Sequence, residues 1–122
     1  MSRTILAVVD DMFFVSKIRA TAEALAVDIA FPRTNEALMA KVADKKPDMI
    51  VVDLQNQKFD PIELARQLKS TEELSGVPLL GFFSHVNADL HRAALEAGYD
   101  QVMPRSVFSR DLAQTLGGRE QE

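Results

Sequence analysis

The chain contains no cysteine, and neither sign of charge is in large excess. Without cysteine there is no disulfide framework and no thiolate metal site, which is typical of proteins of a reducing cytoplasm. The formal net charge is −4 at pH 7, from 18 acidic and 14 basic residues that are interspersed along the sequence. Because non-specific nucleic-acid binding depends on a basic surface, this balance argues against a nucleic-acid partner.

The sequence also lacks a long hydrophobic run, an internal repeat and a low-complexity segment. The apolar residues 5–9 are followed directly by two aspartates, so this run is too short for a signal peptide or a membrane span. We therefore expect a cytoplasmic protein with no membrane partner. Its 122 residues, of which 47% are hydrophobic, suffice for one compact domain. We place that domain at residues 1–116 and a flexible C-terminal tail at 117–122.

Short apolar runs alternate with longer amphipathic segments along the chain. The runs lie at residues 5–9, 27–31, 49–54, 77–83 and 101–103. The first, third and fourth are almost continuously apolar, as parallel strands covered on both faces are. Strand–helix alternation repeated along the whole chain predicts an α/β fold. We expect a single doubly wound five-stranded parallel sheet of order 2-1-3-4-5 with helices on both faces.

The segments between the runs carry helix signals. In the first segment an apolar residue recurs every three or four positions, at Phe14, Ile18, Ala22 and Leu25. The sequence DPIE at 60–63 predicts a helix start, because Asp can cap, Pro suits the first helical position and Glu can close a capping box. The sequence SRDLAQTL at 109–116 predicts one short final helix.

Polar side chains stand where the predicted strands end. Asp10 and Asp11 follow the first strand, Asp53 lies near the end of the third, Ser84 follows the fourth and Arg105 follows the fifth. In an open parallel sheet the carboxyl ends of the strands lie at one edge, and ligands bind there, near the point where the strand order reverses. Strands one and three flank that point, so Asp10, Asp11 and Asp53 are predicted to share one acidic pocket.

Three carboxylates held close together repel one another, and the pKa of at least one should rise. A hard cation removes that repulsion, and Mg²⁺ prefers oxygen ligands, takes few carboxylates and keeps several waters. A phosphoryl group suits the same place, because Ser84 can donate to one of its oxygens and Arg105 can neutralise its charge. A carboxylate can itself be the nucleophile and form an acyl phosphate.

Each of these residues also has a simpler interpretation. Acids at strand ends are often solvated turn residues, Ser84 can cap the helix that follows it, and Arg105 can pair with an acid at the surface. The combination of Asp10 and Asp11 with Asp53 in this fold favours a functional role.

At these residues the chain resembles a response regulator receiver domain of two-component signalling. The resemblance runs from Thr4 to about Leu116 and rests on the segments ILAVVDD, KKPDMIVVDL, VPLLGFFS and EAGYDQVMPRS. It implies a flavodoxin-like fold in which Asp10, Asp11 and Asp53 hold Mg²⁺. It also implies that Asp53 accepts a phosphoryl group, which Ser84 contacts.

The resemblance also implies partners. The phosphoryl group would come from a sensor histidine kinase or a phosphotransfer protein. A stand-alone receiver would signal through a downstream protein or a homodimer, for which the face around the fifth strand and the last two helices is a candidate. Such a domain is not an enzyme beyond its own phosphorylation and autodephosphorylation.

The sequence departs from the family after the fifth strand. The family has Lys followed by Pro, whereas Arg105 and Ser106 stand here. Arg keeps the charge of Lys but is longer and planar, so the exchange is not conservative at a tight phosphate site. We expect this loop to be rebuilt, since Pro104 arrives two positions early.

Other departures affect switching. The family's aromatic switch residue is replaced by Val102, and the loop QNQKFDP at 55–61 lacks the family's glycine. His85 stands where the family prefers a small residue, so it would hinder phosphodonors and attacking water.

Two alternatives follow from these departures. A pseudo-receiver would keep the fold as a protein-binding module without phosphorylation. A small Mg²⁺-dependent phosphatase is disfavoured, because one such family has a second Asp two residues after its nucleophile, and from Asp10 that position is Met12.

Overall fold

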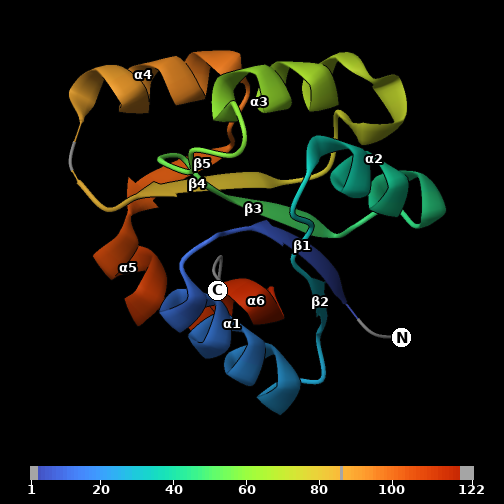
Figure 1. Cartoon of the computed structure of the whole chain (residues 1–122), viewed down its shortest axis with the longest axis vertical. Helices are drawn as coiled ribbons and strands as arrows, with labels where there is room; N and C mark the ends of the chain where they lie inside the picture. The colour runs from blue at the N-terminus through green and yellow to red at the C-terminus, as the bar shows by residue number, and fades with distance from the viewer. Residues whose placement is uncertain (1–2, 86, 119–122) are drawn as a thin grey trace.

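A computed structural model describes residues 3–85 and 87–118. Its elements are β1 (Thr4–Val8), α1 (Met12–Ala24), β2 (Asp28–Ala30), α2 (Asn35–Asp44), β3 (Met49–Asp53), α3 (Pro61–Ser70), the 3-10 turn η1 (Glu72–Leu74), β4 (Leu79–Phe83), α4 (Ala88–Ala97), β5 (Gln101–Pro104), α5 (Arg105–Arg110) and α6 (Leu112–Gly117). The strands form one five-stranded parallel sheet in the order β2-β1-β3-β4-β5, which confirms the predicted topology (Figure 1).

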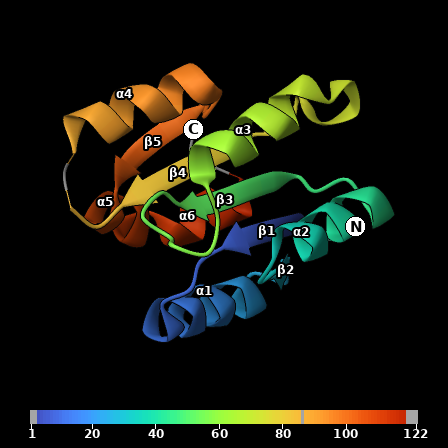
Figure 2. The ribbon, with the colours of Figure 1, turned by 45° about the horizontal axis from the view of Figure 1, so that its top comes forward.

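Helices cover both faces of the sheet. Helices α2, α3 and α4 lie on one face and α1, α5 and α6 on the other (Figures 1 and 2). Along β1 the side chains alternate, with Leu6 and Val8 in the first core and Ile5 and Ala7 in the second. The strands β1, β3 and β4 are therefore apolar on both faces, which is why their sequences read as continuous rather than alternating runs.

The helix starts follow from local capping. The side chains of Asp11, Thr34, Asp60 and Asn87 each accept a backbone N–H in the first turn of the helix that follows. Asn87 is thus the cap of α4, and the interpretation of Ser84 as that cap is wrong. Gly98 ends α4 with a φ of 126°, a conformation that favours glycine.

The end of the chain differs from the prediction. Instead of one helix over 109–116, two short helices are present, since α5 begins at Arg105 directly after β5 and Asp111 separates it from α6. The backbone of Asp111 leaves the helical conformation, with φ −101° and ψ 19°. Helix α6 includes Gly117, so the predicted tail starts one residue too early, and residues 119–122 of that tail lie outside the described residues.

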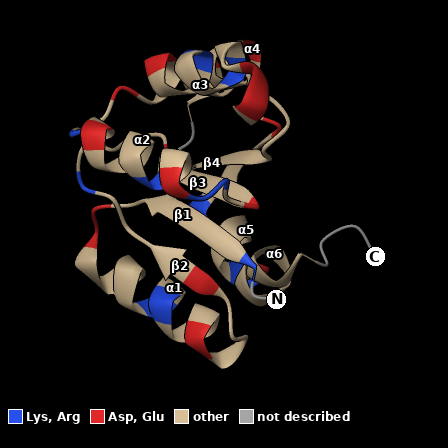
Figure 3. Ribbon diagram, turned by 90° about the vertical axis from the view of Figure 1, so that its right-hand side faces the viewer, with Lys and Arg blue, Asp and Glu red and all other residues tan. Residues whose placement is uncertain are grey.

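Acidic and basic residues are interspersed along the ribbon rather than gathered by sign (Figure 3). No helix of the described residues is long and apolar enough to cross a membrane. Both observations agree with the pattern of charge and hydropathy in the sequence.

Three aromatic rings join α1, β4 and α5 beneath the sheet. Phe82 and Phe108 stack with centroids 4.9 Å apart, and Phe14 meets both edge-on, at 5.3 and 5.7 Å. Phe82 and Phe108 are completely buried. This aromatic cluster fixes α5, and with it Arg105, against α1.

The aromatic cluster yields a stability prediction. Phe108→Ala removes a fully buried ring and should lower the free energy of unfolding by about 3–5 kcal/mol, measured by urea titration. Phe13→Ala is the matched control, because the Phe13 side chain is 90% exposed and its loss should change stability by less than about 0.5 kcal/mol. Equal effects of the two substitutions would contradict this assignment of the core.

Candidate functional site

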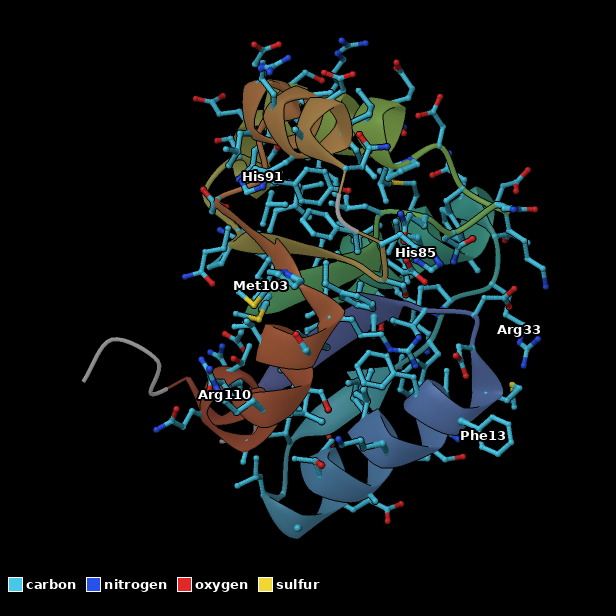
Figure 4. All side chains as sticks on the ribbon, turned by 90° about the vertical axis from the view of Figure 1, so that its left-hand side faces the viewer. Phe13, Arg33, His85, His91, Met103 and Arg110 are labelled. Carbon is cyan, nitrogen blue, oxygen red and sulfur yellow. The ribbon has the colours of Figure 1, made fainter. Side chains whose placement is uncertain are left out.

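The predicted site residues come to one edge of the sheet. Strand pairing sets Val8 beside Val52 and Asp53 beside Phe82, so the carboxyl ends of β1, β3 and β4 are aligned. Asp10 and Asp11 follow β1, and Arg105 follows β5 without an intervening loop. Figure 4 labels His85, Arg33 and Phe13, which come from the segments that leave the sheet here; the Phe13 ring points away from the ribbon.

Asp11 has two structural partners. Its Oδ1 accepts the backbone N–H groups of Phe13 at 2.9 Å and Phe14 at 3.2 Å, which caps α1. Its Oδ2 accepts a hydrogen bond from Arg105 Nη2 at 3.1 Å. The backbone N–H of Phe14 and the Arg105 guanidinium together hold the pKa of the Asp11 carboxyl below its usual value.

Arg105 reaches into the site rather than outward. Its guanidinium carbon lies 4.2 Å from the centroid of the Phe14 ring, so the side chain is held by both a carboxylate and an aromatic face. A lysine would lack the planar group that makes both contacts at once. The departure from the family residue therefore changes how the positive charge is held, and it stays beside the acids.

Asp53 occupies the most buried position among the acids of this edge. Burial raises the pKa of its carboxyl, and the nearby charges of Asp11 and Asp10 act in the same direction. The backbone N–H of Gln55, which donates to Asp53 Oδ1 at 2.9 Å, and the charge of Arg105 lower that pKa in part. The net direction is upward, as the sequence predicted for one of three neighbouring carboxylates.

Asp10 pairs with a base that sequence analysis did not identify. Lys58 Nζ lies 3.4 Å from Asp10 Oδ1, and the two side chains are 55% and 49% exposed. Both residues line a pocket of about 180 Å³ next to the site, which also contains Arg19 and Arg33. Lys58 lies in the loop between β3 and α3. The sequence feature noted for this loop, its lack of a glycine, does not point to a pair between Lys58 and Asp10.

The β3–α3 and β4–α4 loops are joined by Gln55, another residue that sequence analysis missed. Its side-chain oxygen accepts the backbone N–H groups of Ser84 at 2.7 Å and His85 at 3.2 Å. Its side-chain nitrogen donates to the His85 carbonyl at 3.1 Å. An amide side chain two positions after Asp53 was the available signal.

The predicted convergence of Asp10, Asp11 and Asp53 on one acidic pocket is not seen in the described residues. Within residues 3–85 and 87–118, no three acidic or histidine side chains converge closely enough to form a ready metal cage. Asp10 and Asp11 instead meet basic side chains. Val102 is half-buried against the core beneath α4, in the place of the family's aromatic residue.

The dual contacts of Asp11 can be separated by substitution. Asp11→Ala removes the cap of α1 and should lower the melting temperature by about 4 °C in the presence of a chelator. Asp11→Asn keeps an oxygen that can cap and should retain most of that stability, although it loses the ion pair with Arg105. Equal losses in both variants would show that the ion pair, rather than the cap, provides the stability.

No family model matches the sequence. The chain is 30% identical over 98 residues to the gliding motility regulatory protein of Myxococcus xanthus, a match that covers 80% of this chain and 13% of that protein. It is 27% identical over 112 residues to the response regulator MprA of Mycobacterium bovis, covering 92% of this chain and 48% of MprA. It is also 27% identical over 116 residues to the phosphate regulon regulator PhoB of Pseudomonas aeruginosa, covering 95% and 51%. The chain thus spans about half of MprA and PhoB.

Solved structures share the fold. Superposition on the chemotaxis response regulator CheY4 of Vibrio cholerae covers 98% of this chain and 99% of that one, with a TM-score of 0.82 at 14% identity. The receiver domain of the sensor histidine kinase PA1611 of Pseudomonas aeruginosa, solved with a magnesium ion in its active-site cleft, gives a TM-score of 0.80 at 17% identity and covers 95% of each chain. Similarity to response regulators over nearly the whole chain, on a fold shared with these domains, identifies the chain as a response regulator receiver domain with departures at the switch positions.

Proposed function

We propose that this domain accepts a phosphoryl group on Asp53 in a reaction that requires Mg²⁺, and that it signals through protein contacts. The observation that carries the proposal is the environment of Asp53. The half-buried carboxylate follows four buried residues of β3. Burial and the charges of Asp11 and Asp10 raise its pKa, while the Gln55 N–H and the charge of Arg105 act to lower it. Receiver domains are signalling domains rather than metabolic enzymes, and we assign this chain no substrate of its own.

The donor set suits a divalent cation. Asp10, Asp11 and Asp53 supply only oxygen ligands, which Mg²⁺ prefers, and their mutual repulsion is what a cation would remove. The pairs that engage Asp10 and Asp11 are partly exposed, and exposed pairs are weak. Lys58 and Arg105 can therefore yield these oxygens to a metal ion. When bound, the ion supplies positive charge that offsets the charge of a phosphoryl group.

The proposed reaction is a direct transfer to a carboxylate. An oxygen of Asp53 forms a bond to the phosphorus of the donor, the bond from that phosphorus to the donor's leaving atom breaks, and the leaving group keeps the electron pair. Asp53 Oδ1 accepts the Gln55 N–H, which orients the carboxylate. We assign Ser84 to donate to a phosphoryl oxygen and Arg105 to offset its charge.

The partners follow from this chemistry. The donor is a sensor histidine kinase or a phosphotransfer protein, and the output is a downstream protein or a homodimer that uses β5, α5 and α6. The pocket beside Asp10 favours anionic donors, because Arg19, Arg33 and Lys58 line it in a chain whose net charge is negative.

One observation favours the pseudo-receiver as a second candidate. Arg105 and Lys58 engage Asp11 and Asp10, the two acids proposed for the metal. If these pairs persist in the presence of Mg²⁺, the fold acts as a binding module without phosphorylation.

The proposal is tested by intact mass after incubation with Mg²⁺ and acetyl phosphate. The wild-type chain should gain one phosphoryl group, with acetate as the product, and Asp53→Asn should gain none. A chelator should suppress the gain, because the carboxylates would repel the donor without a cation.

A second measurement separates the alternatives. Titration with Mg²⁺, followed by NMR, should perturb the amides around Asp10 and Asp53 if these acids bind the ion. The absence of both a Mg²⁺ response and a mass gain would overturn the proposal in favour of the pseudo-receiver. Turnover of a generic phosphate ester would instead support the phosphatase.

A further inference from the structure

The side chain of Gln55 connects two loops at the site. Its backbone N–H donates to Asp53 Oδ1, while its side-chain amide makes three hydrogen bonds to the backbone that follows β4. A single residue thus contacts both the proposed phosphoacceptor and the β4–α4 loop.

The contact on the β4–α4 loop has the form of an anion site. Two successive backbone N–H groups, of Ser84 and His85, point at one oxygen, Gln55 Oε1, at 2.7 and 3.2 Å. Convergent backbone N–H groups bind anionic oxygens in proteins, and such hydrogen bonds are stronger when the acceptor is charged. In this structure a neutral amide oxygen occupies the two donors.

We propose that Gln55 is an internal ligand of these two N–H groups, occupying the donors that would otherwise bind an oxygen of a phosphoryl group on Asp53. This inference rests on the proposed function. Gln55 is a positioning residue: it holds the β4–α4 loop in place in the unmodified domain and must release Ser84 and His85 when Asp53 is modified. Rotation of its side chain suffices for that release, because its own backbone N–H can stay on Asp53.

Gln55 holds the β4–α4 loop in a domain that lacks the family's aromatic switch residue. Val102 cannot act as an aromatic switch, and Ser84 and His85 are both exposed. The three hydrogen bonds from Gln55 provide the restraint. The competition also makes phosphorylation slower than in a domain whose loop donors are free, since each displaced hydrogen bond must be replaced.

The first arm of the test needs no phosphodonor. Hydrogen exchange of the Ser84 and His85 amides, measured by NMR, should be about fivefold faster in Gln55→Ala than in the wild-type chain. The matched control is Gln57→Ala, which removes the same side chain from an exposed position of the same loop and should leave both amides unchanged. Gln55→Glu keeps an acceptor oxygen and should restore the slow exchange. Unchanged exchange in Gln55→Ala would overturn the proposal.

The second arm tests anion competition without covalent transfer. In an Asp53→Asn background with Mg²⁺ present, titration with inorganic phosphate should shift the Ser84 and His85 amides at a concentration about tenfold lower when Gln55 is also Ala. Equal midpoints with and without Gln55 would overturn the competition.

The third arm measures the rate of mass gain with acetyl phosphate. Gln55→Ala should be modified about tenfold faster than the wild-type chain, and Gln57→Ala at the wild-type rate. An equal rate for Gln55→Ala would overturn the role in phosphorylation. If no variant gains mass, the proposed function fails, whereas the first two arms still decide whether Gln55 occupies the anion site.

Discussion

Burial of a charge at the end of a covered strand is the constraint on which the rest of this site depends. Strand β3 is buried on both faces, and its last residue is an acid. Removing a carboxylate from water is unfavourable unless hydrogen bonds or opposite charge compensate. The backbone N–H of Gln55 and the positive charge of Arg105 provide part of this compensation. The Gln55 N–H is local to Asp53, whereas Arg105 follows β5, on the far side of β4 from β3. The charge of Arg105 therefore lies near Asp53 only when β3, β4 and β5 pair in register.

Two acids of the proposed metal site already have partners within the fold. Asp11 caps α1 with Oδ1 and binds Arg105 with Oδ2, so a metal ion bound through Oδ2 would displace Arg105 and leave the cap in place. Within the described part of the chain Asp10 pairs with one half-exposed lysine, and such exposed pairs are weak, so in the proposed function Asp10 is the acid more easily freed for a metal ion. In the proposed function, the strengths of these two pairs determine how readily the acids bind a cation.

The sequence predicted the topology and the edge at which the site lies, because both depend on hydrophobic runs and on strand ends. It placed Asp10, Asp11, Asp53 and Arg105 at that edge for the same reason, but the shared acidic pocket that it predicted is not formed, since no three acids of the described residues converge. It missed Lys58 and Gln55, since their partners come from loops whose paths no periodicity encodes. The break between α5 and α6 was missed because a change of backbone angles at Asp111 leaves no mark in the pattern of apolar residues.

The guanidinium of Arg105 is held by a carboxylate on one side and by the ring of Phe14 on the other. Phe14 in turn packs edge-on against Phe82 and Phe108, and Phe108 lies one turn along α5 from Arg105 itself. The position of Arg105, which lowers the pKa of Asp11 and Asp53, thus depends on the packing of α5 on α1. A domain without an aromatic residue at position 102 still has a contiguous path of side chains from its acids to its last two helices, through rings that lie beneath the sheet rather than on its surface.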